Sequence, residues 1–141
     1  MLGNYFSTKL NLDVRGVRLP GIISWKVEPT AGTTDYAVAI FYEAIRKKYY
    51  TCPLSENTKL PIMYMPDAIL SLIKLAQAEK SQLKHFADFN VNSMSFTPAD
   101  LAITIKKRIP EFEINYKINP ILQSIADSWP DKLDDSVARK E

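Results

Sequence analysis

Thr33, Thr34 and Asp35 are residues whose types and position could hold a ligand. They stand where a polar Pro/Gly loop gives way to a helical pattern. The first backbone N–H groups of a helix have no partner within it, and the helix dipole is positive at that end. Hydroxyls and free N–H groups gathered at one point would suit an anion such as a carboxylate. The alternative is that Thr33 or Thr34 only caps the helix.

Most other catalytic chemistry is absent from the sequence. The four glycines, Gly3, Gly16, Gly21 and Gly32, form no Gly-x-Gly-x-x-Gly pattern, so we expect no glycine loop for a dinucleotide pyrophosphate. One histidine and one cysteine give neither a Ser-His-Asp set nor a usual zinc site. We therefore expect no metal to be bound.

Tyr5 and Lys9 have a spacing that could transfer a proton. Residues four apart share one face of a helix, so a phenol and an ammonium would lie together there. We interpret the spacing as coincidence, because Tyr5 also fits the apolar stripe of its helix and Lys9 lies close to the following strand. The sequence therefore predicts no catalytic residue in this chain.

The elements around the loop that contains Thr33 and Thr34 alternate between strand and helix patterns. An apolar run over residues 12–23, broken at Pro20-Gly21, predicts a buried strand that ends just before the loop. Apolar residues at i, i+3, i+4, i+7 and i+8 from Ala37 predict the helix after it. Further strands are expected over 49–54, 61–67, 86–96 and 112–118, and helices over 1–10, from near 68, 98 and 120, and after 135. This alternation indicates an α/β domain.

Three of the helices have recognisable start signals. Thr97 with Asp100 resembles a capping box, Asn119 precedes a proline, and Asp67 precedes an apolar helix that we expect it to cap. That helix is apolar nearly all round, which predicts burial on more than one side. The helices at the two ends of the chain are uncapped or unfinished, which favours a piece of a longer protein.

The composition is that of one ordinary globular domain. The 141 residues are 46% hydrophobic and 24% charged, enough to form a core. The net charge of +2 does not indicate binding to nucleic acid or to a membrane surface. A single cysteine, no signal peptide and no apolar membrane span make a reducing, cytoplasmic setting the expectation.

Several stretches of the sequence resemble one family. The most specific are GTTDYAV and IADSWP, and the others are LDVRGVRLPGIISWK, LPIMYMPDAI, MSFTPADLA and IPEFEINYK. On these stretches the chain is similar, in order and from about Tyr5 to Glu141, to the carboxyl half of short-chain-type L-threonine 3-dehydrogenases. These belong to the extended short-chain dehydrogenase or NAD-dependent epimerase/dehydratase superfamily.

The resemblance implies a Rossmann-type fold, with residues 1–50 as the last part of the sheet region and 51–141 mainly as a small α/β substrate-binding lobe. It implies that Leu19, Pro20 and Gly21 pass beside the nicotinamide of NAD. Thr33 and Thr34 match the loop that faces the substrate. Trp129 matches a tryptophan that helps close the site, although a core aromatic before Pro130 is the alternative.

The activity implied is oxidation of L-threonine to 2-amino-3-ketobutyrate by a complete, homodimeric enzyme. The glycine-rich NAD loop and the catalytic tyrosine and lysine would lie before Met1. The chain alone is therefore expected to be inactive. The alternatives are a nucleotide-sugar epimerase or dehydratase fragment, and a non-catalytic remnant or binding module.

Overall fold

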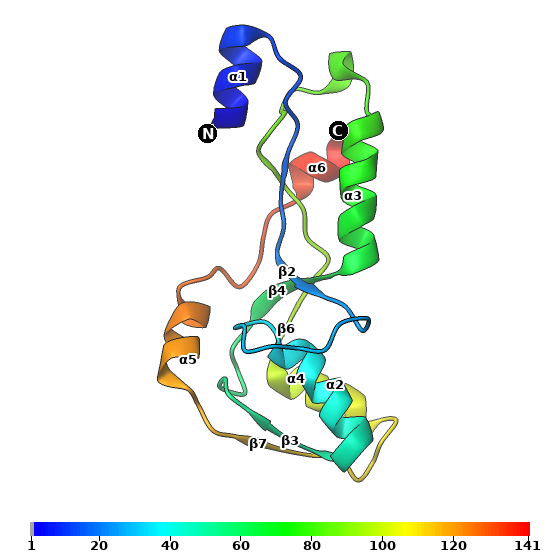
Figure 1. Ribbon diagram of the computed structural model, residues 1–141, viewed down its shortest axis with the longest axis vertical. Helices are drawn as coiled ribbons and strands as arrows, with labels where there is room; N and C mark the ends of the chain where they lie inside the picture. Colours follow the sequence, from blue (N-terminus) through cyan, green and yellow to red (C-terminus); the bar gives the residue numbers. More distant parts are fainter. Residues whose placement is uncertain (1) are drawn as a thin grey trace.

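The computed structural model describes residues 2–141 as alternating helices and strands (Figure 1). In chain order these are α1 (Leu2–Leu10), β1 (Val17–Arg18), β2 (Gly21–Ile23), α2 (Tyr36–Lys47), β3 (Tyr49–Cys52), β4 (Leu60–Tyr64), α3 (Met65–Gln77), the 3-10 turn η1 (Lys80–Gln82), β5 (Phe89–Asn90), β6 (Met94–Phe96), α4 (Pro98–Lys106), β7 (Glu113–Tyr116), α5 (Pro120–Asp127) and α6 (Ser136–Lys140). The predicted α/β class is confirmed. Met1, the first residue of the predicted opening helix, lies outside the described residues.

The strands form three small sheets. β1 pairs with β5 and β3 with β7, both in parallel. The third sheet has the order β2-β4-β6, with β2 parallel and β6 antiparallel to β4. Figure 1 shows α1, α3 and α6 at one end of the molecule and α2, α4, β3 and β7 at the other, with the β2-β4-β6 sheet between them.

The predicted single strands over 12–23 and 86–96 are both wrong in extent. Each is divided into two short strands that belong to different sheets: β1 and β2 in the first stretch, β5 and β6 in the second. In the first stretch Pro20 has no N–H to donate to a ladder, so the pairing with β5 stops before it and pairing with β4 starts after it. The chain thereby passes from one sheet to the next.

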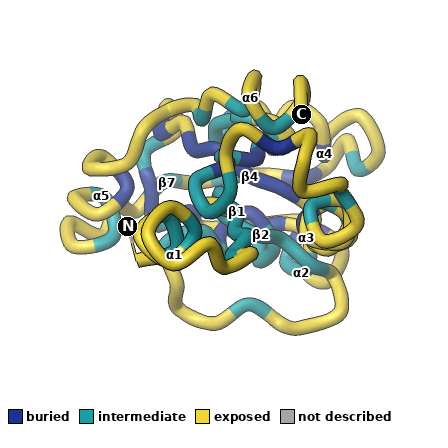
Figure 2. The backbone as a smooth tube through the Cα atoms, turned by 90° about the horizontal axis from the view of Figure 1, so that it is seen from above, coloured by how far each residue is buried: buried dark blue, intermediate teal, exposed yellow. Residues whose placement is uncertain are grey.

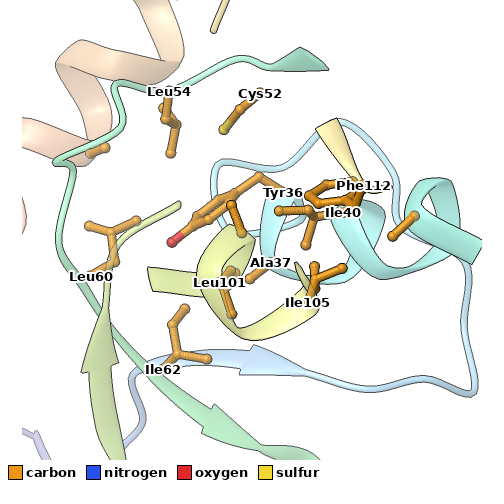
Figure 3. Close-up of a cluster of buried hydrophobic side chains, with 13 residues drawn as sticks. Tyr36, Ala37, Ile40, Cys52, Leu54, Leu60, Ile62, Leu101, Ile105 and Phe112 are labelled. Carbon is orange, nitrogen blue, oxygen red and sulfur yellow. The ribbon is translucent and has the colours of Figure 1, made fainter. Parts of the chain in front are cut away.

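The main core lies between α2, α4 and the neighbouring strands (Figure 3). Its fully buried members include Ile40, Cys52, Leu60 and Phe112, each 0% exposed. Burial raises the pKa of the Cys52 thiol. The Tyr36 ring is buried in the same cluster, and its hydroxyl makes no hydrogen bond within residues 2–141. Burial raises the pKa of Tyr36 as well.

Local capping signals agree with the structure at two helices. The Thr97 side chain accepts from the Asp100 N–H at 3.1 Å, and the Asp100 carboxylate accepts from the Thr97 N–H at 2.9 Å, which completes the capping box of α4. Asn119 Oδ1 accepts from the N–H groups of Ile121 and Leu122 at the start of α5. These two helices begin where the sequence predicts because side chains within three residues satisfy their first N–H groups.

The prediction for α3 is wrong in two respects. The helix begins at Met65 with Tyr64 as its N-cap, so Asp67 lies inside the first turn and does not cap it. Burial is also much less than predicted, because Ala68 is the one residue of α3 that is buried. Most of the helix is coloured as exposed in Figure 2.

Candidate functional site

The threonine loop, residues 24–35, joins the carboxyl end of β2 to the start of α2. β2 and β4 are parallel, and Ile23 pairs with Tyr64 at the end of both strands. The crevice beyond the carboxyl ends of parallel strands is where α/β proteins bind ligands. The loop therefore lies at the edge of the sheet where a ligand is expected.

Gly21 and Thr34 lie in direct contact at the base of this loop. A Cβ atom built on Gly21 would stand 2.7 Å from Thr34 Cγ2 and 2.8 Å from Ile62 Cδ1. Real Cβ atoms do not approach so closely, so a glycine is what allows the start of α2 to pack on β2. One residue predicted to lie beside the cofactor thus touches one predicted to face the substrate.

The Asp35 carboxylate holds the loop together from inside. Its Oδ2 accepts from the Thr30 N–H and the Thr30 hydroxyl, both at 2.7 Å, and from the Gly32 N–H at 3.2 Å. Burial opposes ionisation of Asp35, but these hydrogen bonds outweigh it and lower the pKa of the carboxyl below its ordinary value. The N–H groups of Thr30 and Gly32 are therefore used by the protein itself.

The structure corrects the capping alternative for the two threonines. The N-cap of α2 is Asp35, which makes no side-chain capping bond, and Thr33 and Thr34 lie two positions and one position before it, respectively. The Thr34 carbonyl accepts from the Ala37 N–H, so this residue contributes its backbone to the first turn. Both threonine side chains are half-buried. Their hydroxyls remain the groups of the loop suited to a polar ligand.

Three aromatic side chains hold the other end of the loop, and no sequence pattern predicts this arrangement. Trp25 Nε1 donates to the Tyr64 hydroxyl at 3.0 Å, and the Tyr42 hydroxyl donates to the Trp25 carbonyl at 2.6 Å. Trp25 is nevertheless 66% exposed. These residues come from β4, α2 and the loop, so only the folded chain brings them together.

The other predicted site residues are exposed or half-buried. Leu19 is 41% exposed in the turn between β1 and β2, next to the half-buried Pro20. Trp129 is 40% exposed at the end of α5, where its N–H donates to the Ala126 carbonyl. The alternative for Trp129, a core aromatic before Pro130, is therefore wrong.

A cavity of about 690 Å³ lies elsewhere, between α3, α6 and the β1·β5 pair. Its walls include Val17, Leu70, Phe89 and Arg139, and none of the predicted site residues lines it. The cavity and the threonine loop are therefore separate features.

The described residues include no glycine loop for the pyrophosphate of a dinucleotide. No glycine in residues 2–141 has a positive φ, and the sequence holds no glycine loop that could receive a pyrophosphate. Leu19, which the resemblance places beside the nicotinamide, is exposed. Among these residues there is also no cluster of metal-binding side chains, and no helix long and apolar enough to cross a membrane.

Comparisons with known proteins agree with the architecture. No family model matches the chain. An uncharacterized epimerase/dehydratase of Staphylococcus haemolyticus is 45% identical over 141 residues, which are 100% of this chain and 44% of the relative. The mitochondrial L-threonine 3-dehydrogenase of Sus scrofa is also 45% identical over 141 residues, 100% of this chain and 38% of the relative.

Solved structures give the same result in three dimensions. The L-threonine dehydrogenase of Clostridium difficile is 50% identical with a TM-score of 0.96, over 99% of this chain and 44% of that protein. The chain therefore spans less than half the length of these relatives. The resemblance seen in the sequence is confirmed: along its whole length the chain is similar to the carboxyl-terminal part of L-threonine 3-dehydrogenases.

Proposed function

We propose that this chain is the substrate-binding part of an NAD-dependent L-threonine 3-dehydrogenase. The observation that supports it best is similarity along the whole chain to enzymes with that name, at 45–50% identity. In this proposal residues 1–50 complete the sheet region and residues 51–141 form mainly the substrate lobe. The complete enzyme would convert L-threonine to 2-amino-3-ketobutyrate, and would be a homodimer.

The chemistry divides between this chain and the part of the enzyme that the chain does not span. NAD, held mainly by that other part, would supply the hydride acceptor. The Thr33 and Thr34 hydroxyls would donate hydrogen bonds to the carboxylate or accept one from the hydroxyl of L-threonine. Asp35 would keep the loop in the shape that presents them, through its three hydrogen bonds. Leu19, Pro20 and Gly21 would line the nicotinamide side.

Trp129 would close the site against water. Its 40% exposure leaves part of the ring free to cover a ligand. Exclusion of water strengthens hydrogen bonds to a charged substrate, because the local dielectric constant falls. The side chain would act by covering the substrate, without taking part in proton transfer.

A joined protein tests the proposal. Residues 2–141 would replace the matching carboxyl-terminal part of the C. difficile enzyme. Turnover of L-threonine would be followed by NADH formation, and turnover of a uridine diphosphate sugar by chromatography of the sugar product, because epimerisation and dehydration release no net NADH. We expect turnover of L-threonine only. A folded protein that binds NAD but leaves L-threonine unchanged would refute the proposal.

The isolated chain is the matching control. It lacks the glycine loop and the general base, so we expect neither tight NAD binding by calorimetry nor NADH formation from L-threonine. Turnover by the 141 residues alone would show that the division of chemistry described above is wrong.

A further inference from the structure

The threonine loop is held by contacts along its whole length. In its first half, Trp25 donates from Nε1 to the Tyr64 hydroxyl of β4, and its carbonyl accepts from the Tyr42 hydroxyl of α2. Glu28 forms an ion pair with Arg46, which also belongs to α2. The first half of the loop is therefore attached both to the sheet and to the helix that follows.

A single residue, Pro29, separates the first half from the segment that Asp35 holds. The ion-paired Glu28 lies directly before it, and Thr30, whose N–H and hydroxyl donate to Asp35, lies directly after it. The ring of a proline locks its φ angle at about −65°, so Pro29 is a stiff link. A displacement of the first half therefore also moves the segment that carries the two threonines of the site.

Strand β4 contacts both ends of the loop from one side. Ile62 and Tyr64 are two residues apart in this strand, so their side chains point to the same face of the sheet. Tyr64 holds Trp25 at the start of the loop. At the end of the loop Thr34 packs on Gly21 beside Ile62, since a Cβ atom built on Gly21 would stand 2.7 Å from Thr34 Cγ2 and 2.8 Å from Ile62 Cδ1. The carboxyl end of β4 is thus the base on which both ends of the loop rest.

The two tyrosine hydroxyls are the contacts that place the first half of the loop. The Arg46 and Glu28 side chains are 53% and 68% exposed, and ion pairs between exposed side chains contribute little to stability. Trp25 is 66% exposed, so burial does little to fix its position. Its hydrogen bonds to Tyr64 and Tyr42 remain as the directional contacts that determine where it lies.

We propose that Tyr64 and Tyr42 are positioning residues, which act through Trp25 on the shape of the threonine loop. Held in this shape, the loop presents Thr33 and Thr34 to the substrate. The inference rests on the proposed function and adds residues that act on the same site without touching the substrate. A loop ordered before the substrate arrives loses less conformational entropy on binding. When a smaller fraction of molecules has the loop in the binding shape, the apparent dissociation constant of the substrate rises by the same factor.

Steady-state kinetics of the joined protein test the proposal. Tyr64→Phe and Trp25→Phe each keep an aromatic ring and remove one partner of the same hydrogen bond. We expect each to raise the KM for L-threonine about two- to tenfold, the usual range for one hydrogen bond, with kcat and the KM for NAD nearly unchanged. The double variant should be no worse than the worse single variant, because both substitutions break the same bond. Tyr42→Phe breaks the other bond to Trp25 and should raise the KM for L-threonine in the same range.

Tyr49→Phe is the matched control. The Tyr49 side chain is 42% exposed, against 38% for Tyr64, and its hydroxyl accepts from Thr51 within β3 at 3.3 Å. This variant therefore loses a phenol hydroxyl of similar exposure that does not contact the loop. We expect its KM for L-threonine to equal that of the unmodified protein.

Hydrogen exchange of the loop, followed by mass spectrometry without L-threonine, gives a readout besides activity. The N–H groups of Thr30 and Gly32 are bonded to Asp35 and lie beyond Pro29 from Trp25. If the first half of the loop holds the second, peptides containing these two N–H groups should exchange at least twofold faster in Tyr64→Phe. Their exchange rate should not change in Tyr49→Phe. Thermal melts of the same samples exclude global unfolding as the cause.

A raised KM for L-threonine together with faster exchange of the loop supports the proposal. Faster exchange with an unchanged KM would make the contacts structural only, and a raised KM with unchanged exchange would place Tyr64 in direct contact with the substrate; either result overturns the positioning role. Equal effects in Tyr64→Phe and Tyr49→Phe would overturn it as well. An unmodified joined protein that leaves L-threonine unchanged would instead refute the proposed function, and this inference with it.

Discussion

Gly21 and Thr34 meet so closely that a Cβ atom on the glycine would stand 2.7 Å from Thr34 Cγ2. Gly21 has no positive φ, so space and not backbone conformation requires the glycine. This contact ties β2, at the edge of the sheet, to the threonine loop. The position of the Thr34 hydroxyl therefore depends on the smallest residue of β2.

Gly21→Ala should destabilise the chain by about 1–3 kcal/mol, the usual cost of overpacking. Thr34→Ser removes the methyl group that the new Cβ meets, so the double variant should recover part of the loss. Urea unfolding of the two single variants and the double variant measures this coupling. Additive effects would show that the contact does not limit position 21.

In the joined enzyme, Thr34→Ala and Trp129→Ala should lower kcat/KM for L-threonine by about ten- to a hundredfold. For Thr34→Ala, loss of one hydrogen bond to a charged group costs about 1.5–3 kcal/mol, which corresponds to that range. Trp129→Ala should weaken the same contacts by admitting water. NAD affinity should stay nearly unchanged, and Thr34→Ser should retain most activity because it keeps the hydroxyl. Steady-state kinetics and melts on the same samples are required. A lowered Tm with unchanged kcat/KM would remove both residues from the site.

Asp35→Asn should destabilise the threonine loop by on the order of 1 kcal/mol at neutral pH, after allowance for partial solvent exposure. The hydrogen bonds that lower the pKa of Asp35 favour its charged form, so their contribution is complete above the ordinary aspartate pKa of about 3.9. It is lost as the pH falls through the lowered value. The Tm difference between wild type and variant, measured from pH 7 to pH 2.5, should shrink at the acid end. A difference that does not vary with pH would contradict this role.

Tyr36→Phe should leave stability unchanged or raise it by about 1 kcal/mol. The buried hydroxyl of Tyr36 has no hydrogen-bond partner in the described residues, and leaving a buried polar group unpaired costs about 1–3 kcal/mol. Tyr36→Ala is the contrast, because loss of the ring from the core should cost about 3–5 kcal/mol. Chemical unfolding separates the two. Marked destabilisation by Tyr36→Phe would reveal an internal water or another partner for the hydroxyl.

Elements with local start signals could be predicted from the sequence. Thr97 and Asp100 are three residues apart, and the Asn119 side chain reaches only Ile121 and Leu122. The alternating pattern of β7 is equally local, since side chains point to opposite faces along one strand. In these cases the residues that determine the structure are sequence neighbours.

Features that depend on distant partners could not be predicted. The apolar run over 12–23 contains no sign that its first part pairs with Phe89 and its second with Ile62. Apolar residues around the whole of α3 suggested burial, but among the described residues Ala68 is the one residue of this helix that is buried.

The candidate site shows the same division. The position of the threonine loop followed from the pattern of strand, loop and helix. The contact of Gly21 with Thr34 and the bond of Trp25 to Tyr64 join residues 13 and 39 positions apart, and no local pattern reports them. The hydrogen bond from the Thr30 N–H to Asp35 is local and could have been predicted, because aspartate often accepts from nearby loop N–H groups. The position of Asp35 at the start of α2 suggested only a role in the helix terminus.

The alkylation rate of Cys52 should report how often the main core opens. The thiol is 0% exposed and burial raises its pKa, so in the closed state it is shielded from alkylating reagents. At pH 8, iodoacetamide should therefore modify Cys52 only when the core opens, and the labelling rate should report the frequency or population of opening. Because Cys52 is the sole cysteine, mass spectrometry would read this rate without any engineered label.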